Sequence, residues 1–291
     1  MSEGTARANG TPLVVGQEVP ERDATLRLMA ELWYEQVPDL EDPRLLSALQ
    51  EVSAETQLAD GSYRIPHVDV TMELEAGVAP LLTVVIPGSS LAQEGKTLPD
   101  VSQTWDWAGA ETALQGCTGS VIVSELLANL FTPEQRVTGL TSVLSVLVAH
   151  TRPRAVFWPN SHRVTDPAQF DPESLDGVLN VRFFTVETEG GTEGEQASRV
   201  MDTLGLDLFE LPDIQCHYRD YEPRDVAAML YSTAVYVFSG GDVIDDGHTI
   251  SGPRGDERFP CRHEPALVPP ARTVLDVDLG EPYAAGRRDR S

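Results

Sequence analysis

The order of strand-like and helix-like segments constrains the fold of this chain more than any other feature of its sequence. Segments of alternating or continuous apolar residues, typical of strands, are interleaved with segments whose apolar residues recur every three or four positions, typical of helices. The two kinds do not alternate one for one, as they would in a chain of βαβ units. We therefore predict an α+β fold whose mixed, largely antiparallel sheet is flanked by helices.

The segment after Pro133 carries the clearest helical pattern, because Val137, Leu140, Leu144 and Leu147 form one apolar stripe behind a proline that can open a helix. The predicted helices cover residues 21–37, 43–50, 104–117, 133–151 and 223–238. The predicted strands cover residues 13–15, 67–74, 81–86, 119–123, 155–158, 178–186, 199–202, 214–218, 243–250, 258–263 and 273–277.

No linker-like segment interrupts the chain, so we predict a single domain over residues 12–283. A division into subdomains 12–165 and 166–283 is compatible with the pattern. Residues 1–11 are small and polar and are predicted to be a disordered tail, and residues 284–291 a solvated one.

The chain of 291 residues has a formal net charge of −25 and a hydrophobic fraction of 41%, which is typical of a globular protein. Such a charge repels nucleic-acid phosphates and anionic membranes, and it attracts basic proteins and metal cations. A second interpretation is that the acidity only keeps the protein soluble. Lys96 is the only lysine beside 20 arginines, which genome composition or a saline habitat would also produce.

Three cysteines, Cys117, Cys216 and Cys261, form no CxxC pair, and their odd number argues against a disulfide framework. No apolar run approaches the roughly 18 to 20 residues that span a bilayer. The first residues lack the basic and apolar regions of a signal peptide. These features predict a soluble protein of the cytoplasm.

Several separate motifs occur in one order along the chain. They are QTWDWA at 103–108, AVFWPNS at 155–161, NVRFF at 180–184, MDTLGLDLFELPDIQCH at 201–217, DVAAMLYSTAVYVFSGGDVIDDGHTI at 225–250 and CRHEPALVPPARTVLDV at 261–277. In this order they resemble the bacterial DUF4261 family, over about residues 65–280. The resemblance implies no activity, because the function of that family is unknown.

Strong catalytic motifs such as GxxxxGK[ST], GxSxG and HExxH are absent from the sequence. The richest polar cluster lies in the second half of the chain. Its members are Asp202, Thr203, Asp213, His217, Asp246, His248 and His263. Histidines and carboxylates bind divalent metals when the fold brings them together, and His217, His248 and His263 would then be the ligands. Aspartates beside glycine or proline also make ordinary turns and caps, which is the simpler interpretation.

Trp105, Trp107 and Trp158 are the conspicuous aromatic residues, and exposed tryptophans often anchor protein interfaces. Trp105 and Trp107 lie two positions apart, so on a helix they would point to different sides. We treat all three as candidate interface residues, with burial in the core as the alternative.

Two hypotheses about function follow from the sequence. In the first, the protein is a non-catalytic interaction or regulatory protein, in one version an immunity-type protein that binds a basic partner, and it needs no cofactor. In the second, it is a metal-dependent hydrolase of unfamiliar type, in which Asp213 or Asp246 acts as a ligand or as the base that activates water. Convergence of the candidate side chains on one point distinguishes the two.

Overall fold

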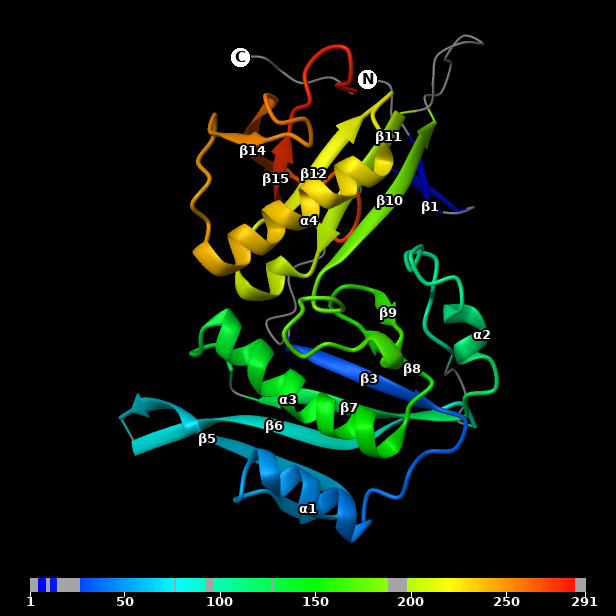
Figure 1. The fold of residues 1–291 in the computed structure, drawn as a ribbon, viewed down its shortest axis with the longest axis vertical. Helices are drawn as coiled ribbons and strands as arrows, with labels where there is room; N and C mark the ends of the chain where they lie inside the picture. The colour runs from blue at the N-terminus through cyan, green and yellow to red at the C-terminus, as the bar shows by residue number, and fades with distance from the viewer. Residues whose placement is uncertain are drawn as a thin grey trace. The chain divides into compact units, whose positions relative to one another are not determined.

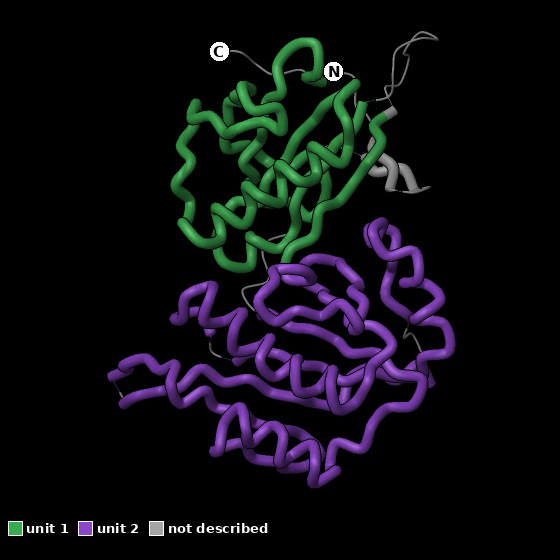
Figure 2. The backbone as a smooth tube through the Cα atoms, in the orientation of Figure 1, with its two compact units in different colours: residues 1–24, 179–291 green, residues 25–178 purple. Residues whose placement is uncertain are grey.

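A computed structural model of the chain shows two compact units. The structure describes residues 5–8, 11–14, 27–75, 77–92, 97–126, 128–187 and 198–285. Unit 1 comprises residues 1–24 and 179–291, and unit 2 comprises residues 25–178 (Figure 2). The two units are defined by the contacts within each of them, which do not show whether each unit folds by itself. The single domain over 12–283, with a possible boundary between 165 and 166, therefore stays a prediction.

Unit 2 is built on a seven-stranded sheet in which all neighbouring strands are antiparallel (Figure 1). The strand order is β4-β5-β6-β7-β3-β8-β9. The strands are β3 (Met29–Tyr34), β4 (Gln57–Ala59), β5 (Ser62–Leu74), β6 (Gly77–Ser90), β7 (Gly119–Leu126), β8 (Ala155–Trp158) and β9 (Arg163–Thr165). The helices are α1 (Pro43–Val52), α2 (Ala110–Leu114) and α3 (Pro133–Thr151), with a 3-10 turn at Pro167–Gln169.

Helix α3 follows the predicted pattern closely. Thr132 and Gln135 form a capping box, in which each side chain bonds the other residue's backbone N–H, and Pro133 begins the helix. Its apolar stripe, with Leu140, Leu144 and Leu147 fully buried, packs against β6 and β7. This packing joins the best-patterned helix to the centre of the unit 2 sheet.

Two predicted helices of unit 2 are wrong in whole or in part. Residues 29–34 form strand β3, between β7 and β8, and residues 21–26 of the predicted helix 21–37 lie outside the described residues. A central strand is apolar on both faces, so its residues also satisfy helical spacing by coincidence. The predicted helix 104–117 shortens to α2, whose Ala110 and Leu114 pack on Trp33.

Unit 1 contains an eight-stranded sheet with the order β13-β14-β15-β12-β11-β10-β1-β2. The strands are β1 (Thr5–Ala8), β2 (Thr11–Val14), β10 (Asn180–Glu187), β11 (Ser198–Leu204), β12 (Asp213–Tyr218), β13 (Thr249–Ser251), β14 (Arg258–Pro265) and β15 (Thr273–Val277). The 3-10 turn Leu206–Phe209 and helix α4 (Pro223–Gly240) complete the unit. Among the described strands, only β12 and β15 pair in parallel. Within the tail predicted for residues 1–11, residues 5–8 form β1, which pairs with β10, and residues 1–4 and 9–10 lie outside the described residues.

The two faces of the unit 1 sheet have different covers. Phe184 and Val200 pack against Val268 in the loop between β14 and β15, residues 266–272. Alternate residues of a strand point to opposite faces. Met201 and Ile214 therefore point to the other face, against which α4 contacts β10, β11 and β12 (Figure 1). The central strands β10, β11 and β12 are thus covered on both faces.

The secondary structure confirms the predicted class. Both sheets are largely antiparallel, and helices pack on them, as in an α+β fold. Of the helices in the described ranges, none is long and apolar enough to cross a membrane. The three cysteines are buried, and none of them forms a disulfide.

Candidate functional site

The first three residues of the predicted polar cluster come together inside unit 1. Asp202 on β11 and Asp213 on β12 are both fully buried, and so is Thr203. The Thr203 hydroxyl donates to Asp213 Oδ1 over 3.0 Å and accepts from the backbone N–H of Ile214 over 2.9 Å. Because β11 and β12 separate here, the threonine side chain replaces a backbone bond of the ladder.

Two arginines that sequence reasoning did not select neutralise these carboxylates. Arg182 on β10 binds Asp202 through both arms, with Nε–Oδ1 at 2.9 Å and Nη2–Oδ2 at 2.5 Å. Arg272 bridges the two aspartates, with Nη2 2.5 Å from Asp202 Oδ2 and Nε 2.8 Å from Asp213 Oδ2. The Arg272 side chain is fully buried. Two positive and two negative charges thus form a neutral, buried network.

The same network holds the loop 266–272 on the sheet. Arg182 donates to the carbonyl of Pro269, and Arg272 donates to the carbonyl of Pro270 over 2.7 Å. Gln215 accepts the backbone N–H of Leu267 over 2.7 Å. The loop covers the aspartates and keeps solvent from them, so its carbonyls and the carboxylates satisfy the arginine donors.

Burial and pairing act in opposite directions on the titration of this network. Burial raises the pKa of Asp213 above its ordinary value, against the lowering effects of Arg272 and of the Leu206 N–H. Burial by itself lowers the pKa of Arg272, but the charges of Asp202 and Asp213 outweigh it and raise that pKa. Both carboxylates of the network have a guanidinium partner. This arrangement suits a role in stabilising the fold better than a role as an exposed acid or base.

His217 shares strand β12 with Asp213 but contacts a different residue, Ser198. It lies four residues beyond Asp213 on β12, so the two side chains point to the same face of the sheet. Its Nε2 is 3.0 Å from the hydroxyl of Ser198.

Asp246 and His263 form a second cluster together with Asp242. His263 Nδ1 lies 2.9 Å from Asp246 Oδ1, and His263 Nε2 lies 3.1 Å from Asp242 Oδ1. Its backbone N–H also donates to Asp246 Oδ1. Burial by itself lowers the pKa of His263, but the hydrogen bonds to Asp246 and Asp242 outweigh it, so the net shift is upward. The backbone N–H of His263 and its ring lower the pKa of Asp246.

The three histidines that were candidate metal ligands do not converge. His263 is opposite Leu275, and Leu275 is opposite Ile214, so His263 lies on the face of Ile214. His217 is three residues beyond Ile214 and lies on the other face. His248 is exposed and 3.7 Å from a carboxylate oxygen of its neighbour Asp245. Among the residues that the structure describes, no group of three or more His, Cys, Asp or Glu could hold a metal ion.

The candidate interface tryptophans differ in exposure. Trp158 is fully buried, and its Nε1 donates to Thr165 Oγ1 over 3.0 Å, so it belongs to the core and not to a surface. Trp107 is partly buried against the cluster around Trp33. Trp105 is 49% exposed and is the one of the three that a partner could reach.

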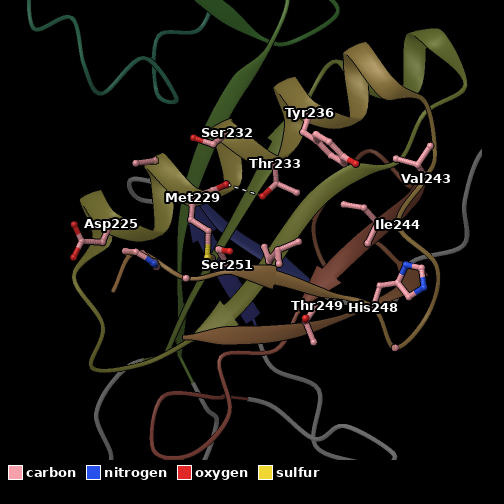
Figure 3. A pocket seen from close by; sticks show the side chains of 15 residues that line it. Asp225, Met229, Ser232, Thr233, Tyr236, Val243, Ile244, His248, Thr249 and Ser251 are labelled. Atoms are coloured by element: carbon pink, nitrogen blue, oxygen red, sulfur yellow. Dashed lines mark hydrogen bonds between the residues drawn. The ribbon is translucent and has the colours of Figure 1, made fainter. Parts of the chain in front are cut away.

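An open groove of about 900 Å³ lies within unit 1, between α4 and the segment that leads into and through β13 (Figure 3). One side is a stripe of α4 formed by Asp225, Ala228, Ser232 and Tyr236. The other side is residues 247–253. Buried apolar side chains lie at its base, with Met229 from α4 and Ile244 from the connecting segment. This size is in the range of ligand-binding pockets.

The second polar cluster holds one wall of this groove in place. Asp242 and Asp246 flank Val243 and Ile244, which line the groove, and both aspartates are bound by His263. Figure 3 shows Ile244 and Val243 beside Tyr236 of α4. His263 thus acts on the groove through the segment that it anchors.

Sequence reasoning missed the groove and the two arginines for different reasons. Arg182 interrupts an otherwise apolar strand, NVRFF, and a charged residue there signals a buried partner. Arg272 lies in a loop, where an arginine carries no such signal. The groove forms because α4 lies beside β13, and the local sequence pattern of either element does not predict that they are neighbours.

The comparisons with known proteins identify one family. Residues 202–278 match the model of a family described as "Domain of unknown function (DUF4261)". No curated protein and no solved structure matches the chain significantly. The match confirms the resemblance for these residues, and its extension to residues 65–201 stays a prediction. The residues that match this model, 202–278, contain α4, the groove and three of the four charges of the buried network.

Proposed function

We propose that the protein is a non-catalytic interaction or regulatory protein that binds a basic protein partner through the groove of unit 1. One observation carries the proposal: of the residues that line the groove, only Asp225 bears a fixed charge, and no lysine or arginine is among them. The buried carboxylates Asp202 and Asp213 are paired with arginines inside unit 1, while the groove is open.

The charge around the groove supports a basic partner. Residues 222–258 contain seven acidic residues, Glu222, Asp225, Asp242, Asp245, Asp246, Asp256 and Glu257, and three basic residues, Arg224, Arg254 and Arg258. The whole chain has a formal net charge of −25. Such a field speeds the encounter with a positively charged protein and disfavours acidic competitors.

The proposal includes two further expectations. The protein acts in the cytoplasm, where its three free cysteines are stable as thiols. Nucleic acids and anionic membranes are not partners, because the charge repels both. An immunity-type protein that captures a toxin with a basic surface is one version of this function.

Peptide selection on the immobilised full chain tests the proposal. A random peptide library is selected at about 0.1 M NaCl, where the Debye length is roughly 10 Å. We expect the selected peptides to be enriched in lysine and arginine and to lose affinity at about 1 M NaCl, where it is roughly 3 Å. Selected peptides without a basic bias, or binding that salt does not weaken, would contradict a basic partner.

Two variants of equal charge locate the binding. Asp225→Asn removes the carboxylate of the groove, and Asp69→Asn removes an exposed carboxylate of unit 2. An exposed charge pair contributes about 0.2–1 kcal/mol, so Asp225→Asn should weaken binding by up to about fivefold. Asp69→Asn should leave it unchanged. Equal losses in both variants would show that only the net charge matters and not the groove.

A further inference from the structure

The strand that borders the groove has an unpaired edge. β13 is the last strand of its sheet, and β14 is its only neighbour among the described strands. The His248 carbonyl accepts from Cys261, and the Gly252 N–H donates to Glu257, so these positions face β14. Because the bonding direction alternates along an antiparallel strand, the N–H and C=O groups of Thr249 and Ser251 face away from β14.

The helix side of the groove has the length of a short extended peptide. The stripe on α4 runs from Asp225 to Tyr236, and a rise of about 1.5 Å per residue makes it about 16 Å long. An extended chain rises about 3.3 Å per residue, so about five residues fit along the groove. Ala228 and Ser232 in the middle of the stripe are small and exposed, which leaves room for a backbone beside them.

The chemistry of the groove matches alternate apolar and basic side chains. Met229, Ile244 and Ile250 offer apolar surface along the inside of the groove. Asp225 lies at the end near the start of α4. Asp245 and Asp246 lie at the end beyond Ile244, and both are exposed. A segment with apolar residues directed inward and basic residues directed outward would complement both features.

We propose, on the basis of the proposed function, that an extended basic segment of the partner adds to the edge of β13 as a further strand, with α4 as the opposite wall. Backbone bonds to Thr249 and Ser251 supply affinity, as in other proteins that bind a peptide by strand addition. Alternate side chains contact the apolar base, and the remaining ones meet the acidic ends. Specificity then depends on an alternating sequence pattern and not on charge alone.

The probe for this mode is a short peptide of alternating lysine and valine, tested with the full chain by isothermal titration calorimetry. Its control is the same peptide with N-methyl groups on alternate backbone amides, which keeps the charge and the side chains but removes the donors of one edge. A second N-methylated peptide blocks the other set of amides. We expect one of the two methylated peptides to bind about tenfold to a hundredfold more weakly, because two or so hydrogen bonds are lost.

Variants of the protein test the same contact from the other side. Ser251→Pro removes an N–H that faces away from β14, whereas Ser251→Ala keeps it. Proline is tolerated on an edge strand, so the fold should survive, and circular dichroism checks this. We expect about a threefold to tenfold loss of affinity in Ser251→Pro and none in Ser251→Ala. Ala228→Trp, on the exposed side of α4, should block the groove and abolish binding.

The outcomes separate this mode of binding from the proposed function. If the peptide binds with strong salt dependence but neither N-methylation nor the variants weaken it, the basic partner stands and strand addition is wrong. If the peptide does not bind at any salt concentration, both proposals fail. Dimers of the free protein that Ser251→Pro dissociates would show that a second copy pairs with β13, which would overturn the choice of partner.

Discussion

Removal of Arg272 should destabilise unit 1 strongly, because two buried carboxylates depend on this side chain. Arg272→Met keeps much of the apolar volume and removes the guanidinium that bridges Asp202 and Asp213. Asp202 retains Arg182, but Asp213 retains only the Leu206 N–H and the Thr203 hydroxyl.

The expected cost follows from the burial of these groups. Removing one partner of a buried ion pair costs about 3–5 kcal/mol, because the other charge stays buried without compensation. With about 2 kcal/mol per molar urea, a typical dependence, the unfolding midpoint should fall by about 2 M. In hydrogen exchange, about 4 kcal/mol corresponds to roughly thousandfold faster exchange of amides that open with the whole unit. The control Arg262→Met changes an exposed arginine of β14 and should cost less than about 0.5 kcal/mol.

The assay can follow each unit separately. All four tryptophans, Trp33, Trp105, Trp107 and Trp158, lie in unit 2, so tryptophan fluorescence during urea unfolding reports on that unit. Hydrogen exchange in peptides that cover β11 and β12 reports on unit 1. We expect Arg272→Met to speed exchange there. A fluorescence transition that does not move would also show that unit 2 unfolds independently of unit 1.

A double variant and a pH series test whether the unpaired charge of Asp213 causes the loss of stability. The double variant Arg272→Met with Asp213→Asn removes the unpaired charge and should be more stable than Arg272→Met alone. The deficit of the single variant should shrink as the pH falls, because loss of Arg272 raises the pKa of Asp213 further and a protonated carboxyl buries no charge. A cost of Arg272→Met equal to that of Arg262→Met, or a deficit that does not change with pH, would show that the network contributes little.

Two further predictions concern other parts of the chain. Gly177 has φ +93°, and a Cβ there would lie 2.2 Å from the buried Trp158 ring, so Gly177→Ala should cost about 2–5 kcal/mol in tryptophan-detected unfolding. Gly116→Ala, at φ +83° with open space, should show only the backbone cost of about 1–2 kcal/mol, and equal costs would contradict the clash. The pKa of His263 is raised in the folded state, so its contribution to stability is present below the unfolded value of about 6.5 and is lost as the pH rises through the higher folded value. An NMR titration of the His263 ring should show this upward shift, and deprotonation of the ring should be accompanied by faster amide exchange of residues 242–248. A pKa of His263 at or below about 6.5 would contradict its pairing with Asp242 and Asp246.

The sequence pattern predicted the elements whose local signals agree with their final environment. α3 and α4 begin at prolines and carry one buried stripe, and both were predicted nearly to their ends. β3 was predicted as a helix because a strand buried on both faces has no alternation to reveal it. Its identity depends on β7 and β8, which are distant in sequence.

The candidate site was predicted in composition but not in arrangement. Asp202 and Asp213 come together because β11 and β12 are neighbours, yet their partner Arg272 arrives from a loop 59 residues beyond Asp213. His217 and His263 fall on opposite faces because of a register that sequence alone does not state. Residue types therefore indicated where polar chemistry lies, and the strand register determined which of these residues meet.

Amide exchange of β13 in the presence of the lysine–valine peptide shows whether the peptide pairs with the edge of this strand. Backbone-assigned NMR of the full chain would compare Thr249 and Ser251 with and without peptide, and the amide of Ile250 would serve as the internal control that already faces β14. We expect protection of the Thr249 and Ser251 amides to increase when the peptide binds, with Ile250 little changed, because a new strand would bond the outer edge of β13. Saturated binding without added protection at Thr249 and Ser251 would contradict strand addition in this groove.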